Sequence, residues 1–181
     1  MKERILNYLS FDNRKVFILR IILIISALFL LISLVLPYAT ASLAFKENLI
    51  LYGDRVVDKD TGFTGNALIN MNLFEFITLH VHDTSYDGSG LIVGLLVAIV
   101  VLTFLTVILV GLKKNVFCAV TSILTFLLVL LINFDFSDRG LVGYNYEWGV
   151  AHFFYIFFTI IIIASAIVSK ILNKIDKTKR A

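Results

Sequence analysis

The sequence predicts an all-α membrane protein: a bundle of four transmembrane helices with a small extracytoplasmic α+β domain in the loop between the first two. Two observations lead to this fold class. Of the 181 residues, 59% are hydrophobic, against about 45–50% in a typical soluble domain. The excess is concentrated in four long runs with almost no charge, which is typical of membrane spans rather than of a large soluble core.

The four runs each have close to the ~20 residues with which a helix crosses about 30 Å of hydrocarbon. Their predicted bounds are 16–36, 91–112, 116–134 and 148–168. They contain many β-branched residues, which favour strands in water, but in lipid a helix satisfies every backbone N–H within its own segment. Pro37, the only proline, is expected to stop the first helix just outside the membrane.

Basic residues predict the direction of the spans. Twelve of the sixteen lie in the terminal segments 1–15 and 169–181, in the short turn 113–115, or at Arg20 near the start of the first span. Ten of the thirteen acidic residues lie on the opposite side, in the loops 37–90 and 135–147. By the positive-inside rule we expect both termini in the cytoplasm and the protein in a plasma or inner membrane. A composition rich in Phe, Ile and Lys suits a low-GC bacterium.

The first run has one alternative interpretation, a secretory leader. Ala39-Thr40-Ala41 resembles a signal-peptidase site that follows a basic and then apolar segment. The apolar run before it has 21 residues, which is longer than the ~7–15 of a removable leader. We therefore expect an uncleaved first helix.

The first half of the loop 37–90 is predicted as short strands. Tyr38 to Phe45 interleaves apolar with small or polar residues, and Leu49 to Tyr52 continues the pattern after a turn. Gly53-Asp54 and Asp58–Gly62 have the residue types of tight turns. We expect a hairpin or a three-stranded sheet that packs on the rest of the loop or on the membrane surface, because a lone hairpin is marginally stable.

The second half of this loop, Asn66 to Val81, is predicted as a helix. Ile69, Leu73, Phe76 and Ile77 recur at the spacing of one helical face. The segment is too short and too polar for a fifth span, so we expect it to lie at the interface or to cover the strands. The residues expected to cap its start are Asn66, Asn70 or Asn72.

The stretch 82–90 contains the first half of a calcium loop. Asp83, Ser85, Asp87 and Gly88 match positions 1, 3, 5 and 6 of an EF-hand, which also needs a bidentate Glu at position 12. That position falls on Gly94, so a calcium loop is not expected. A turn that leads into a helix explains the same residues, with a weak cation site as the alternative.

The three histidines, His80, His82 and His152, are all predicted on the outer side. His80 and His82 share one face if their segment is a strand, and they diverge if it is a helix. Together with a nearby acid, the three would supply the ligands of a zinc-type site or a proton switch near pH 6. From the sequence we therefore put forward the hypothesis of a metal site at His80, His82 and His152. The alternative is three unrelated structural histidines.

No residue pattern for catalysis or cofactor binding is present. The sequence contains no zinc-protease motif and no Gly-rich phosphate loop, and no Asp, Glu or Lys lies within a predicted span. The hydroxyl residues within the spans are expected on helix–helix faces rather than in a pore; they are Ser26, Ser33, Thr103, Thr106, Thr121, Ser122, Thr125, Thr159 and Ser165. We predict a non-enzymatic protein without a cofactor and without a nucleic-acid partner.

The arrangement resembles that of claudin-type four-span proteins: a long first outer loop with strands, a short second one, and both termini inside. The resemblance covers topology alone. The claudin loop carries a Trp-containing motif and a Cys pair, whereas the loop 37–90 contains neither Trp nor Cys. No claudin residue and no junction function is therefore carried over.

The predicted function is protein–protein interaction, as an accessory or regulatory subunit of a cell-envelope complex or as an immunity-type protector. The outer loop would supply the specific surface, and the Ser/Thr faces of the spans would supply a lateral one. The expected partners are the lipid bilayer and either a membrane protein or further copies of the chain. The alternative is a small transporter or channel component that works as an oligomer.

Overall fold

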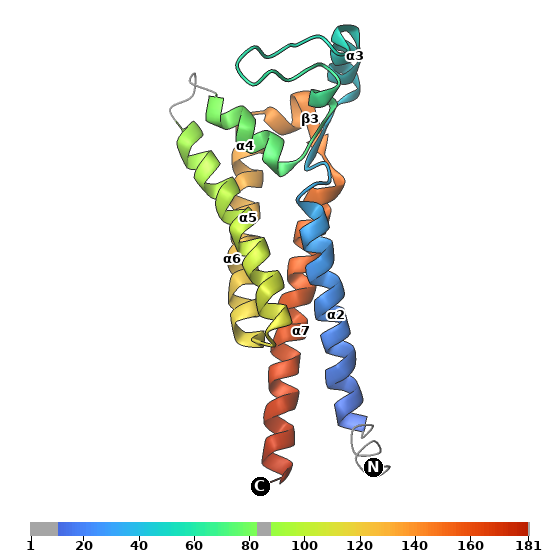
Figure 1. Cartoon of the computed structure of the whole chain (residues 1–181), viewed down its shortest axis with the longest axis vertical. Coiled ribbons are helices and arrows are strands. Elements are labelled where there is room, and N and C mark those ends of the chain that lie inside the picture. The colour runs from blue at the N-terminus through green and yellow to red at the C-terminus, as the bar shows by residue number, and fades with distance from the viewer. Residues whose placement is uncertain (1–10, 83–87, 181) are drawn as a thin grey trace.

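The computed structural model describes residues 11–82 and 88–180 and shows a bundle of long helices with a small cap at one end (Figure 1). Within these residues, four helices are long and apolar enough to cross a membrane. They are α2 (Phe11–Ser33), α5 (Ser89–Gly111), α6 (Asn115–Asp138) and α7 (Val150–Arg180). The four predicted spans are confirmed as helices, and they indicate a multi-pass membrane protein.

The helix ends differ from the predicted span ends. α2 ends at Ser33, four residues before Pro37, because a proline in a helix has no N–H to donate and its ring would clash with the carbonyl of the residue four positions earlier. α7 continues to Arg180, through the basic tail, since a hydropathy window detects contact with lipid and not the end of a helix. We call the end where α2 begins and α7 ends the terminal end, and the opposite end the cap (Figure 1).

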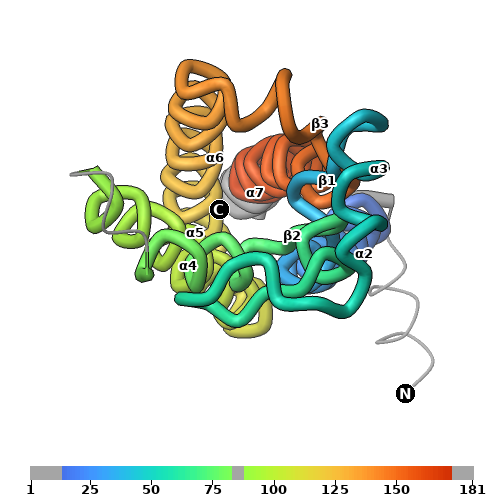
Figure 2. Tube along the Cα trace, turned by 90° about the horizontal axis from the view of Figure 1, so that it is seen from above, coloured from blue at the N-terminus to red at the C-terminus, as the bar shows by residue number. Residues whose placement is uncertain are grey.

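The four helices form a closed bundle. α7 packs against both α2 and α6, and α5 packs against the other side of α2 and α6, as the view along the axis shows (Figure 2). Their hydroxyl side chains are buried inside this one chain, and Thr106 donates a hydrogen bond to Thr121 across the α5–α6 contact, at 2.8 Å. The expectation of helix–helix faces is confirmed. The expectation that these faces form a lateral surface for a partner is wrong, because the chain uses them itself.

A small antiparallel sheet closes the cap. Its strands are β1 (Ala39–Ala41), β2 (Asn70–Met71) and β3 (Tyr146–Trp148), in the order β2-β1-β3. The register pairs Thr40 with Asn70 on one side and with Glu147 on the other. A three-stranded sheet is therefore present, but only β1 comes from the segment where strands were predicted.

The segment after β1 is a helix, α3 (Leu43–Tyr52), where the sequence predicted strands. This prediction was wrong because the alternation of apolar and small residues at 38–45 corresponds to a strand only as far as Ala41. Ala44, Lys46, Glu47 and several leucines have high helix propensity, and the run Leu49–Tyr52 completes the last turn. The chain then returns through residues 53–66 and the short helix η1 (Ala67–Ile69) to β2.

The predicted helix over Asn66–Val81 is present in its second part, as α4 (Leu73–His82). Of the three asparagines expected to cap it, Asn72 does so: its Oδ1 accepts the N–H groups of Phe74 at 2.9 Å and Glu75 at 3.1 Å. Glu75 in turn accepts the Asn72 N–H at 2.7 Å, which completes a capping box. α4 lies against the outer end of α5, and Leu73 and Phe76 are fully buried.

Two remote segments meet where the cap joins the bundle. The Gly149 N–H donates to the Tyr38 carbonyl and the Ala151 N–H to the Pro37 carbonyl, both at 2.9 Å. A Cβ atom at Gly149 would lie 2.2 Å from the Pro37 oxygen, so only glycine allows this approach. We call residues 37–41 and 146–151 the clasp. It ties the end of the first span to the start of the fourth.

Candidate functional site

The structure places His80 and His82 on α4, where their spacing of two residues turns them to different sides. His80 is only 4% exposed, whereas His82 is an exposed side chain at the end of the helix. The Nδ1 atom of each lies 2.9 Å from the carbonyl oxygen four residues earlier, in Phe76 and Thr78. The two rings therefore do not face a common site.

His80 has partners at both ring nitrogens. Its Nε2 lies 3.3 Å from the Arg139 guanidinium, which can only donate, so Nε2 accepts and Nδ1 carries the proton for the Phe76 carbonyl. Arg139 also forms an ion pair with Asp135, and the His80 ring stacks on Phe136 at 5.9 Å between centroids. This environment holds a neutral imidazole in a fixed orientation and leaves no nitrogen for a metal ion.

His152 lies at the start of α7 in a different set of contacts. It is 7% exposed, and its ring stacks on Trp148 with centroids 4.2 Å apart. Its Nδ1 is 3.3 Å from Oδ1 of Asn133, which also accepts the Tyr38 hydroxyl at 2.7 Å. Burial raises the pKa of Tyr38, so this phenol stays a neutral hydrogen-bond donor.

The contacts of the three histidines give the zinc hypothesis no support. Among the side chains that the structure describes, in residues 14–82 and 88–172, no three of His, Cys, Asp or Glu are grouped as ligands. The calcium-loop residues Asp83, Ser85 and Asp87 lie outside the described residues, so that hypothesis rests on the sequence alone. His80 and His152 instead belong to a packed aromatic cluster beneath the cap.

This cluster joins α3, α4, α6 and β3 to the segment before β1, although these parts are far apart in the chain. Neighbouring rings have centroids 5.0–6.4 Å apart; in the order of their contacts they are Phe45, Tyr146, Phe76, Phe136, Tyr38 and Trp148. Such contacts add to the stability that burial provides. The cluster is a packed core that connects the cap to the helices of the bundle.

Tyr146 fixes the upper side of the cluster. Its hydroxyl donates to the Leu68 carbonyl at 3.0 Å and lies 3.3 Å from the Met71 sulfur. Burial, with a contribution from the charge of Glu75, raises the pKa of Tyr146 to about 12. The neutral phenol therefore links β3 to η1 and β2 at every ordinary pH.

α3 lies on top of this core, at the point of the molecule farthest from the terminal end (Figure 1). Apart from Lys46, Glu47 and Asn48, the ten residues of α3 are apolar, and they occupy all sides of the helix. Leu49 is nevertheless the only one of the ten that is buried. A helix that is apolar all round is normally covered on all sides. The exposed apolar side chains here form what we call the α3 patch, which consists of Leu43, Ile50, Leu51, Tyr52 and Val56.

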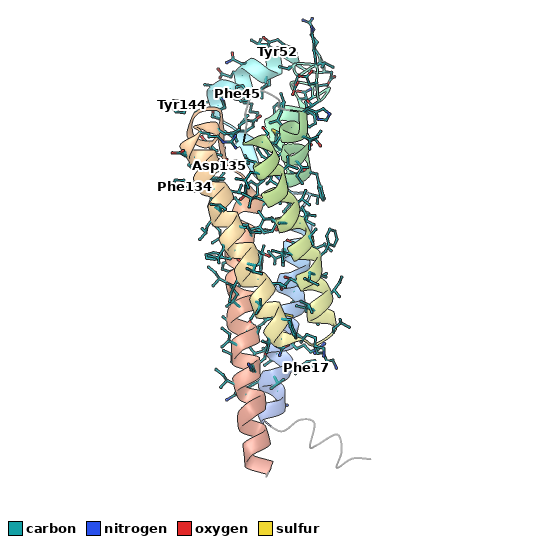
Figure 3. All side chains as sticks on the ribbon, turned by 90° about the vertical axis from the view of Figure 1, so that its left-hand side faces the viewer. Phe17, Phe45, Tyr52, Phe134, Asp135 and Tyr144 are labelled. Atoms are coloured by element: carbon teal, nitrogen blue, oxygen red, sulfur yellow. The ribbon has the colours of Figure 1, made fainter. Side chains whose placement is uncertain are left out.

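The α3 patch has a defined geometry. Leu43, Ile50 and Leu51 follow the spacing of one helical face, and Leu43 and Leu51 are 75% and 80% exposed. Glu47 lies on the same face between them. Figure 3 shows Tyr52 at the outer tip of the cap, above Phe45 and Tyr144.

Three contacts hold α3 in this position. Phe45 packs edge-on against Tyr146, with centroids 5.4 Å apart, and Leu49 is buried below the helix. A Cβ atom at Gly65 would lie 2.3 Å from the Leu49 carbonyl oxygen and 3.1 Å from the Gly53 carbonyl oxygen, so glycine lets the returning chain pass close to the C-terminal end of the helix. The α3 patch thus lies on a helix that is anchored to the core. The patch was not predicted because this segment was assigned to strands, although the spacing of Leu43, Ile50 and Leu51 was available as a signal.

Comparison with protein-family models, curated proteins and solved structures gives no match for this chain. The resemblance to claudin-type proteins therefore stays an expectation about topology.

Proposed function

We propose that this chain is a non-enzymatic membrane protein that binds another protein through the α3 patch, as an accessory or regulatory subunit of an envelope complex or as an immunity-type protector. One observation supports this proposal above the others: an apolar helix without a cover, held by a packed core at the end of the molecule. Exposed apolar area of this kind marks an interaction site in proteins.

Lipid does not account for the α3 patch in the way that it accounts for the spans. The outward side chains of α2, α5, α6 and α7 are apolar because they face hydrocarbon. α3 lies beyond β3 and α4, on the far side of the cap from the bundle (Figure 1). The occupant that fits is the extramembrane part of a second protein, with an apolar groove and a cationic side chain opposite Glu47.

The orientation we propose puts the cap outside the cell and both termini in the cytoplasm. α2 begins and α7 ends at the same end of the bundle, and most of the basic residues of the sequence lie at that end. The partner would accordingly be an extracytoplasmic domain or the outer loop of a membrane protein.

The test is purification from the native membrane in mild detergent, with mass spectrometry of the proteins that stay bound. We expect a stoichiometric partner that is lost in Leu51→Glu and retained in Val81→Glu, a change at an exposed apolar residue of α4 outside the patch. A partner that stays bound to the Leu51→Glu variant would refute a role for the α3 patch. Recovery of homo-oligomers alone would refute the proposal as a whole.

The alternative, a transporter or channel component that works as an oligomer, has less support. A pore between subunits needs polar side chains on the outside of the bundle, and the Ser and Thr residues of the spans are buried within it. Conductance of the purified protein in liposomes tests this alternative directly.

A further inference from the structure

A cavity of about 230 Å³ opens between the helices at the terminal end, opposite the cap. Arg20 of α2, Lys113 of the α5–α6 turn, Asn115 of α6 and Ser169 of α7 line its polar side. Val16, Leu23 and Val110 line its apolar side.

The polar side of the cavity is built to receive an anion. Arg20 and Lys113 bring two positive charges, and no Asp or Glu is among the described residues that line it. A guanidinium offers phosphate a planar pair of donors, and an ammonium acts as a point charge. The Asn115 amide and the Ser169 hydroxyl add further donors.

Asn115 is also the first residue of α6, and the preceding Lys114 makes no side-chain cap. The first N–H groups of α6 therefore lack partners within the helix, and the positive end of the helix dipole points the same way. These groups reinforce the two side-chain charges, although the cavity and its cations identify the site without them.

The depth of the cavity matches the headgroup region of a bilayer. Arg20 and Ser169 lie near the terminal ends of the spans Arg14–Ser33 and Val150–Leu172, and Lys113 follows directly after the span that ends at Gly111. Leu23 and Val110 lie deeper in their spans than Arg20 and Lys113, so the wall becomes apolar toward the membrane centre. Val16 adds one apolar side chain farther out than Arg20, and the apolar inner wall suits the glycerol portion of a phospholipid.

We propose that this cavity binds the phosphate group of an anionic phospholipid of the inner leaflet, with its glycerol portion against Leu23 and Val110. Basic pockets between transmembrane helices on the cytoplasmic side are suited to such headgroups. The lipid would bridge α2, the α5–α6 turn and α7, and so hold the ends of all four described spans together on this side. This proposal does not depend on a partner at the α3 patch.

The test is the thermal midpoint of the full-length protein in detergent, titrated separately with dioleoylphosphatidylglycerol, dioleoylphosphatidylcholine and inorganic phosphate. We expect phosphatidylglycerol alone to raise the midpoint of the wild type. Loss of one charge should raise the half-saturating concentration about fivefold, and loss of both in Arg20→Gln/Lys113→Gln roughly 30-fold. Lys114→Gln is the matched control, because Lys114 is an exposed neighbour that does not line the cavity.

Each remaining outcome overturns the proposal. Equal effects of both lipids would exclude recognition of an anionic headgroup, and a comparable effect of inorganic phosphate would assign the cavity to a soluble anion. Equal losses in Lys113→Gln and Lys114→Gln would indicate diffuse surface attraction. Lys113→Gln changes an exposed turn residue, so it remains informative if the double variant does not fold.

Discussion

The clasp makes the sharpest prediction, which is that Gly149→Ala destabilises the protein. The new Cβ atom would lie 2.2 Å from the Pro37 oxygen, 2.8 Å from its carbon and 3.0 Å from the Tyr38 carbonyl carbon. All three are backbone atoms, so no side chain can rotate away. To bring the closest contact from 2.2 to 3.0 Å, the two segments must separate by about 0.8 Å.

The cost follows from this displacement. The hydrogen bonds from Gly149 to Tyr38 and from Ala151 to Pro37 are both 2.9 Å long, and about 0.8 Å more puts them beyond hydrogen-bond distance. Their loss costs ~0.5–1.5 kcal/mol each, and overpacking costs ~1–3 kcal/mol. We expect a loss of roughly 2–6 kcal/mol in the free energy of unfolding. With the relation between unfolding free energy and thermal midpoint that holds for soluble domains of this size, such a loss lowers the midpoint by at least ~4 °C.

Trp148 provides the assay, because it is the only tryptophan and lies in β3 beside Gly149. Thermal unfolding in detergent, followed by tryptophan emission, should show a lower midpoint and a red-shifted emission maximum in Gly149→Ala. Gly94→Ala is the control, because a Cβ atom there meets nothing within 4 Å. A Gly149→Ala variant with the midpoint and emission of the wild type would refute the reasoning about the clasp.

Two further predictions concern the cap. Asn72→Ala removes both capping bonds of α4 and should cost ~1 kcal/mol, seen as a lower thermal midpoint that Asn72→Ser largely restores; an unchanged midpoint in Asn72→Ala would contradict the assigned cap. Tyr146→Phe leaves the buried Leu68 carbonyl without its donor and should cost ~1–3 kcal/mol. The pKa of Tyr146 in the folded protein is about 12, above its usual value of 10, so the stability that this phenol provides is complete below pH 10 and is lost as the pH rises through 12. Thermal midpoints measured from pH 9 to 12 should therefore fall more steeply in the wild type than in Tyr146→Phe. Parallel curves would exclude a buried Tyr146 phenol that donates to Leu68.

The spans could be predicted because a single property, transfer into hydrocarbon, determines them. Each apolar run is long enough to decide its own structure, whatever the rest of the chain does. The buried positions of Thr106 and Thr121 follow from the same argument, since hydroxyl groups in lipid need partners on a neighbouring helix.

The cap was harder to predict because short segments take their structure from remote contacts. The residues of Leu43–Tyr52 are compatible with a strand or a helix. In the folded protein this segment is a helix that packs on the core through Phe45 and Leu49. β1 pairs with β3 more than a hundred residues later, and nothing local to three-residue strands indicates such a register. The spacing Asn72-x-x-Glu75, however, is that of a capping box and identifies Asn72 among the three candidates.

The pairing of β1 with β2 has a consequence for which part of the sequence can be replaced. Residues 42–69 connect β1 to β2. These two strands are paired neighbours, with Thr40 opposite Asn70. The segment therefore begins and ends at almost the same place. Its apolar contacts with the core come from Phe45, Leu49, Phe63, Leu68 and Ile69. It can be grafted or exchanged as a cassette, by engineering or by recombination, while the membrane bundle keeps its sequence. The sequence of this segment can thus change without a change in the helices that span the membrane.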